Sequence, residues 1–176
     1  MKWDFVFISV LLVLLTVGLA LGQGDQAKSA PPPMLPADAA QLWTYIAVTN
    51  PYQGWAIWPG EEEVVPGVSP HGAFVRIYAN AIAMKSLREG KTQLPDGAVL
   101  VKANYGKDKT TFLGLTPMVK IKGYNPDAGD WFWVSYSPDG KATAEGKVKS
   151  CIGCHEAVGS HDWYFTKYET PAKAGQ

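Results

Sequence analysis

The sequence predicts a β-rich α+β fold made mainly of short strands. In the centre of the chain, apolar and polar residues alternate with the period of two that a half-buried strand requires. Proline, glycine, asparagine and aspartate separate these segments, and no long stretch keeps the 3.6-residue period of a helix bundle. Because 47% of the 176 residues are hydrophobic and 18% are charged, the chain can bury a core and general disorder is excluded.

Residues 1–30 are predicted to direct the protein out of the cytoplasm. Residues 5–21 are almost wholly apolar, and the polar and small residues 22–30 follow them. This order is typical of a secretory signal peptide, although Asp4 weakens its positively charged start. The alternative is an uncleaved membrane anchor, because the apolar run is near the lower length limit of a spanning helix. Both alternatives predict a periplasmic or otherwise exported domain.

The folded domain is predicted over residues 37–170. A proline-rich linker over residues 31–36 precedes it, and a tail over residues 171–176 follows it. Apolar residues at helical spacing predict a helix over residues 37–49. Asn80 is placed to cap a second, short helix that runs to about Arg88. The predicted strands cover residues 73–78, 98–105, 112–122, 131–136 and 162–168.

Both cysteines of the chain lie in the run Cys151-Ile152-Gly153-Cys154-His155. A Cys-x-x-Cys-His run is the attachment signature of c-type haem. The two thiols form thioethers with the porphyrin, and the imidazole that follows ligates the iron. A zinc site would need a second ligand pair, and a thioredoxin-like dithiol would need a βαβ context; the sequence has neither. We therefore expect one covalent haem c on Cys151 and Cys154, with His155 as its axial ligand, on a short C-terminal helix.

The position of this motif excludes two common haem-protein layouts. Small electron-carrying cytochromes have the motif near the start and a methionine ligand far downstream, whereas only residues 156–176 follow it here, with no methionine among them. The cytochromes c′ have a C-terminal motif, but they are four-helix bundles, which the strand pattern contradicts. The formal net charge is zero, which gives no support to a nucleic-acid partner.

Several segments match a known family in order along most of the domain. They are His71-Gly72, 76–80, 95–102, 118–120, 123–126, 130–133, 151–155 and 162–165. In these segments the chain resembles the cytochromes P-460 and their relatives, the cytochromes c′-beta. The resemblance implies an antiparallel sheet flanked by a few short helices, one haem c against the sheet, and a homodimer.

The resemblance implies two functions. Cytochromes P-460 oxidise hydroxylamine and carry a lysine–haem crosslink, and Lys102 matches the position of that lysine. Cytochromes c′-beta lack the crosslink and bind nitric oxide or carbon monoxide at an open iron. Residues 115–118 lack the acid that the family enzyme uses for proton transfer, so nitric oxide binding is the first expectation. The alternatives are a hydroxylamine-oxidising enzyme with a Lys102–haem crosslink and an electron-transfer cytochrome, with a redox partner that the sequence does not name.

Five further residues are candidates for positions around the haem. Phe74, Tyr78 and Phe132 are candidates for the pocket wall, with a core position as the alternative. His71 is expected to open a strand, and the alternative is that it reaches the distal iron and closes its sixth position. His161 is expected to stay on the proximal side in a surface or hydrogen-bonding role.

Overall fold

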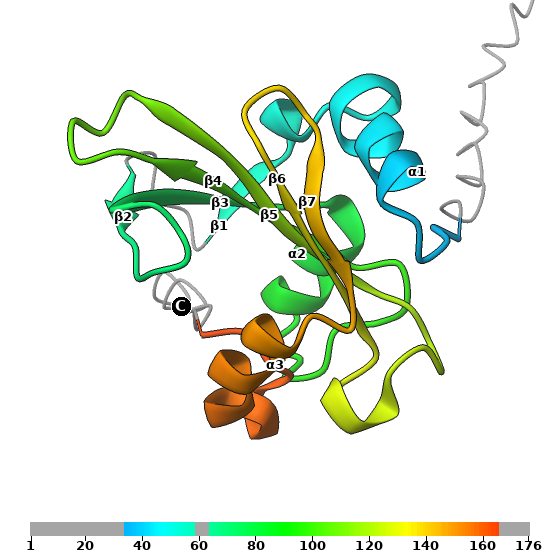
Figure 1. Ribbon diagram of the computed structural model, residues 1–176. Coiled ribbons are helices and arrows are strands. Elements are labelled where there is room, and N and C mark those ends of the chain that lie inside the picture. The colour runs from blue at the N-terminus through cyan, green and yellow to red at the C-terminus, as the bar shows by residue number, and fades with distance from the viewer. Residues whose placement is uncertain (1–33, 59–63, 166–176) are drawn as a thin grey trace, which may run out of the picture. The chain divides into compact units, whose positions relative to one another are not determined.

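The computed structural model describes residues 34–58 and 64–165 of the chain (Figure 1). The leader predicted over residues 1–30, the first half of the predicted linker and the tail over residues 171–176 lie outside the described residues. None of the helices in the described part is long and apolar enough to cross a membrane.

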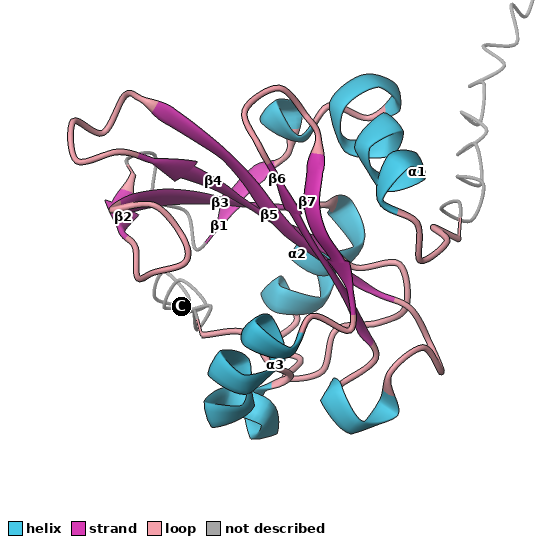
Figure 2. Ribbon diagram, in the orientation of Figure 1, coloured by secondary structure: helices cyan, strands magenta, loops and turns pink. Residues whose placement is uncertain are grey.

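An antiparallel sheet forms the centre of the domain (Figure 2). Within the described residues its seven strands are β1 (Ala56–Trp58), β2 (Val65–Pro66), β3 (Phe74–Ala79), β4 (Val99–Tyr105), β5 (Phe112–Lys120), β6 (Trp131–Tyr136) and β7 (Ala142–Gly146). In space they follow the order β1-β3-β4-β5-β6-β7, and β2 also pairs with β3. Every pairing is antiparallel, which confirms the predicted β-rich α+β class.

The predicted strands are confirmed in the middle of the chain and wrong at its end. The strands predicted over residues 73–136 are found as β3, β4, β5 and β6. The strand predicted over residues 162–168 is absent from its described part, residues 162–165. Asp162 and Trp163 have φ angles of 50° and 66°, and these left-handed values are incompatible with an extended strand.

The helices begin where the sequence predicts them. The first helix, α1 (Ala39–Thr44), continues as a π-helical turn over Tyr45–Thr49, so that together they fill most of the predicted span. The second, α2 (Ala81–Arg88), is capped by Asn80, whose side-chain oxygen accepts a hydrogen bond from the backbone N–H of Ala83 at 3.0 Å. This bond satisfies one of the donors that a helix start leaves unpaired.

The third helix, α3 (Lys149–His155), carries the Cys-x-x-Cys-His run and continues as a 3₁₀ turn over Glu156–His161. It shares one face of the sheet with α2, whereas α1 covers the opposite face (Figure 1). Strand residues alternate between the two cores because successive side chains point to opposite faces. In β4, for example, Val99 packs with α1 and Leu100 packs on the α2 face. The haem motif therefore faces one defined side of the sheet.

Candidate haem-binding site

A cavity lies between the sheet and α3. Its volume is about 180 Å³, and it is partly open to solvent. Cys151, Cys154 and His155 line it from α3, and Lys102 and Thr116 line it from β4 and β5. The structure thus brings together the motif residues and the predicted crosslinking lysine, which lies 49 positions before Cys151 in the sequence.

Lys102 enters the cavity because of the strand register. It pairs with Ile77 on β3 and with Thr116 on β5, so these three side chains form one row across the sheet. All three line the cavity. Burial lowers the pKa of the Lys102 ammonium, and a negatively charged Cys154 would oppose that shift.

His71 also lines the cavity, at the end of the loop that leads into β3. Its Nδ1 lies 2.8 Å from the Thr116 hydroxyl oxygen, and its Nε2 lies 3.4 Å from Lys102 Nζ. Burial, then the neighbouring charges of Lys102 and His155, lowers the pKa of His71 to about 3, which keeps the imidazole neutral. The sequence comparison favoured a strand opener; the structure places this imidazole inside the cavity as well.

His155 is held with a defined nitrogen toward the cavity. It is 5% exposed, and its Nδ1 lies 2.5 Å from the backbone carbonyl oxygen of Trp163. A carbonyl oxygen only accepts, so Nδ1 must carry the proton and Nε2 is left with a free lone pair. Burial lowers the pKa of His155 to about 4, which favours this neutral form. A hydrogen bond from the non-ligating ring nitrogen to a carbonyl oxygen orients a metal-ligating histidine.

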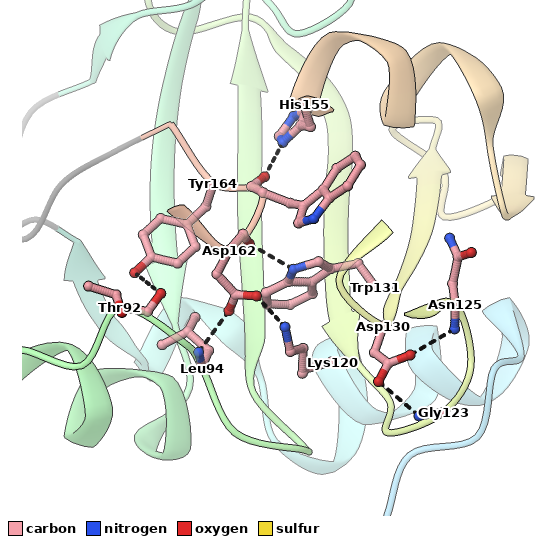
Figure 3. Close-up of polar contacts among 11 residues, drawn as sticks. Thr92, Leu94, Lys120, Gly123, Asn125, Asp130, Trp131, His155, Asp162 and Tyr164 are labelled. Atoms are coloured by element: carbon pink, nitrogen blue, oxygen red, sulfur yellow. Dashed lines mark hydrogen bonds and ion pairs between the residues drawn. The ribbon is translucent and has the colours of Figure 1, made fainter. Parts of the chain in front are cut away.

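The carbonyl that orients His155 is itself fixed by the residue before it (Figure 3). Asp162 is 1% exposed, and its carboxylate accepts from Lys120 Nζ and, at 2.7 Å, from the backbone N–H of Leu94. The Asp162 carbonyl accepts from Trp131 Nε1 at 2.8 Å. We call Asp162 and Lys120 the Asp162–Lys120 clasp. Because it ties the C-terminal segment to the sheet, it holds Trp163 and thereby the orientation of His155.

The family model described as cytochrome P460 matches residues 50–166, about two thirds of the chain. The chain belongs to the cytochrome P460 family. A comparison with curated proteins gave no match. Members of this family carry c-type haem.

The residues of this cavity fit a c-type haem. The two thiols and the free Nε2 of His155 are the donors that covalent attachment and axial ligation require. Trp58 and Trp133 line the same cavity, and within the described residues the indole N–H of each is buried without a hydrogen-bond partner. Buried donors are rarely left unpaired, so these N–H groups fit a cofactor that brings acceptors of its own.

The aromatic residues that line this cavity differ from those predicted for the pocket wall. Tyr78 and Phe132 belong to the core on the opposite sheet face, and the Phe74 ring lies 4.8 Å from Lys109 Nζ. None of the three lines the cavity. In its strand, each of the three points to the face opposite to that of a residue that lines the cavity, as Tyr78 does relative to Ile77. Alternation alone does not say which face of the sheet receives the haem. The aromatic residues found in the lining are Trp58, Trp133, Tyr164 and Phe165.

Two features of the site had no local signal in the sequence. The Asp162–Lys120 clasp joins residues 42 positions apart, and Asp162 stands in an aromatic run that resembles a strand. Trp58 lies in a proline-rich stretch that predicts an irregular loop, yet it ends β1. Contacts between residues far apart in the sequence form the clasp and bring Trp58, which pairs with Ile77, into the cavity lining.

Proposed function

We propose that this protein is an exported monohaem c-type cytochrome whose iron binds a small uncharged ligand, nitric oxide above all. The observation that carries the proposal is the contrast across the cavity: His155 presents one strong ligand, and His71, Lys102 and Thr116 gather across from it. When attached through its thioethers, haem supplies a redox-active iron that can bind a diatomic molecule.

The distal residues suit a small neutral ligand. The Lys102 Nζ and the Thr116 hydroxyl can each donate a hydrogen bond, and apolar side chains such as Ile77 and Leu100 exclude water around them. An uncharged diatomic molecule enters such a cavity without the large desolvation cost of an ion. The same donors then stabilise the polar, metal-bound form of the molecule.

Titration of the reduced, haem-loaded protein with nitric oxide tests this proposal. We expect a shift of the Soret band at stoichiometric nitric oxide. Lys102→Met should weaken binding about threefold to tenfold, the loss of one hydrogen bond. Lys107→Met, an exposed lysine in the β4–β5 loop, is the matched control and should bind like the unaltered protein. An unchanged Soret band at excess nitric oxide would contradict the proposal.

Oxidation of hydroxylamine is a second candidate function, favoured by the position of Lys102. Its lowered pKa increases the fraction of neutral, nucleophilic amine inside the haem cavity. A bond from Lys102 Nζ to a haem carbon replaces one N–H and one C–H bond and releases two electrons and two protons. A peroxide takes up both and is reduced to two waters. Oxidation of hydroxylamine to nitroxyl then releases two electrons and two protons: the neighbouring imidazole of His71 accepts one proton, solvent takes the other, and both electrons pass to a soluble acceptor.

The crosslink can be tested separately from nitric oxide binding. In a protease digest of the loaded protein, a Lys102 peptide joined through haem to the Cys151–Cys154 peptide would support this candidate. Lys102→Ala should then remove the joint peptide and the oxidation of hydroxylamine by an added acceptor dye. If the Lys102→Ala variant has the same digest, spectrum and turnover as the unaltered protein, the second candidate is excluded.

Export and dimer formation belong to the same proposal. Export is supported by the apolar leader predicted over residues 1–30 and by the haem-attachment motif, and a homodimer by the family resemblance. Cell fractionation should find the protein in the periplasm or attached to a membrane. Sedimentation should give twice the mass of one chain. Protein found in the cytoplasm would contradict export, and a sedimenting monomer would contradict the dimer.

A further inference from the structure

We propose that His71 is the second axial ligand of the haem iron in the ligand-free protein, so that a small molecule binds by displacing it. This inference rests on the proposed function, since it describes the resting state of the same iron. It replaces the open sixth position expected from the family resemblance with one that is closed by an exchangeable imidazole.

The separation of the two imidazoles carries the inference. The ring centres of His71 and His155 lie 6.3 Å apart, and their planes are inclined by 76°. A metal–imidazole nitrogen bond is about 2.0–2.1 Å long, as in zinc sites. The centre of a five-membered ring with bonds of about 1.33 Å lies about 1.1 Å from each atom. Two imidazoles on opposite sides of one metal therefore have centres about 6.2–6.4 Å apart. The observed distance falls within this range.

The hydrogen bonds leave the same nitrogen free on both rings. Nδ1 of His155 donates to the Trp163 carbonyl, and Nδ1 of His71 lies against the Thr116 hydroxyl. That hydroxyl is held in turn by Asn104, whose side chain lies 3.3 Å away. With the proton on Nδ1, where Thr116 can accept it, the His71 ring matches the His155 ring: Nδ1 is engaged by the protein and Nε2 is available. Lys102 Nζ, at 3.4 Å from Nε2 of His71, is at the long end of hydrogen-bond distances and competes weakly for that nitrogen.

Besides the two thiols, Met118, Lys102 and Tyr164 are the other cavity residues with an atom that can ligate haem iron, and the fold favours His71 over them. The Tyr164 hydroxyl is turned to the backbone carbonyl of Thr92, to which it donates at 3.4 Å. Met118 pairs with Trp133, whose ring lies 4.6 Å from the His155 ring, so this row of the sheet runs beside His155. Within the described residues, the hydrogen-bond contact of Lys102 Nζ is the long one to Nε2 of His71, so no short hydrogen bond orients the amine toward the iron. His71 brings an imidazole, and its ring stands at ligation distance from the His155 ring.

A displaceable imidazole gives the site a selection rule. An incoming molecule must bind the iron more tightly than His71 does, and its apparent affinity falls by the fraction of protein in which His71 is bound. Strong ligands such as nitric oxide satisfy this condition, whereas weak ones are excluded. His71 lies between a proline and a glycine, outside the regular strand, so its departure need not disturb the pairing of β3.

Optical and near-infrared magnetic circular dichroism spectra of the oxidised, haem-loaded protein test the inference, because they distinguish two imidazole ligands from imidazole with amine, thioether or water. We expect a low-spin, bis-imidazole spectrum for the unaltered protein. His71→Ala should be high-spin, and added imidazole should restore the low-spin spectrum by filling the space. His161→Ala, the remaining histidine, is the matched control and should keep the unaltered spectrum.

Nitric oxide separates this inference from the proposed function. Carbon monoxide should bind reduced His71→Ala at least about tenfold more tightly than the unaltered protein, while nitric oxide should bind both. A high-spin spectrum of the unaltered protein, or a bis-imidazole spectrum that survives His71→Ala, would overturn the inference and leave nitric oxide binding standing. If the spectrum is bis-imidazole and nitric oxide never displaces His71, the function fails and the ligand assignment stands.

Discussion

The two sides of the haem cavity are built differently. His155, on the proximal side, is oriented by the carbonyl of Trp163, which the Asp162–Lys120 clasp and Trp131 tie to the sheet. The imidazole of His71, on the other side, has its polar contacts to two side chains of the described residues, those of Thr116 and Lys102. The proposed permanent ligand is thus oriented by a segment that buried tertiary bonds tie to the sheet, and the proposed exchangeable ligand is held by two side-chain contacts.

Energetics sharpens this contrast. The clasp is a buried ion pair with side-chain exposures of 0% for Asp162 and 11% for Lys120, so losing one partner strands a buried charge. Each contact of His71 is a single hydrogen bond, worth about 0.5–1.5 kcal/mol in net stability. We therefore expect proximal changes to lower the free energy of unfolding and distal changes to alter the spectrum at little cost in stability.

The largest effect is expected from the attachment residues. Replacing both Cys151 and Cys154 by alanine should abolish covalent haem, because no other thiol exists in the chain. Haem staining after denaturing electrophoresis and the intact mass of the chain measure this directly. Ser150→Ala, a change of similar size in the cavity lining, should keep the haem. Covalent haem on the double variant would show that these thiols are not the attachment sites.

The second-largest effect is expected from changes in the Asp162–Lys120 clasp. Asp162→Asn keeps an acceptor for the Leu94 N–H but leaves the Lys120 ammonium buried without its counter-ion, so we expect a loss of about 3–5 kcal/mol in the free energy of unfolding. Urea unfolding of the haem-free chain measures it. Lys120→Met alone should also destabilise, and the double variant should lose less than the two single losses together. Strict additivity would show that the two residues do not act as a pair.

A smaller loss is expected where Trp163 packs against the chain. Gly129 has a φ of 65°, and a Cβ there would lie 2.5 Å from Cδ1 of Trp163. Gly129→Ala should displace that ring and lower the free energy of unfolding. Gly123→Ala is the matched control, since its φ is 78° and a Cβ there would meet nothing within 4 Å. The Gly129 variant should lose about 1–3 kcal/mol more than the control; equal losses would mean that only backbone strain matters.

The smallest loss of stability is expected on the distal side. Thr116→Val removes the hydroxyl beside Nδ1 of His71 and should cost about 1 kcal/mol or less. Its spectrum should nevertheless shift toward high-spin because His71 is held less firmly. Thr44→Val removes a comparable hydrogen bond on α1, far from the cavity, and should leave the spectrum unchanged. A large loss of stability with an unaltered spectrum for Thr116→Val would reverse the comparison.

The sequence predicted those parts of the molecule that depend on local patterns. Alternation placed β3 to β6, Asn80 marked the start of α2, and the Cys-x-x-Cys-His run marked the short C-terminal helix. It did not predict β1, which has three residues, or β7, an edge strand without a regular apolar face. Strands this short or exposed are specified by their partners more than by their own residues.

The candidate site was predictable in its chemistry but not in its arrangement. Lys102 was placed near the haem by resemblance, whereas Phe74, Tyr78 and Phe132 were placed on the wall and lie outside the cavity lining. Which sheet face receives the haem depends on where α3 docks, and that depends on the clasp between distant residues. For the same reason the distance between His71 and His155 could not be obtained from their positions in the sequence.

A crystal structure of the haem-loaded protein without added ligand tests the central claim most directly. The account predicts one haem joined to Cys151 and Cys154, with Nε2 of His155 and Nε2 of His71 on opposite sides of the iron and the clasp intact. A haem outside this cavity, or an iron whose sixth position is empty or taken by another side chain, would contradict it.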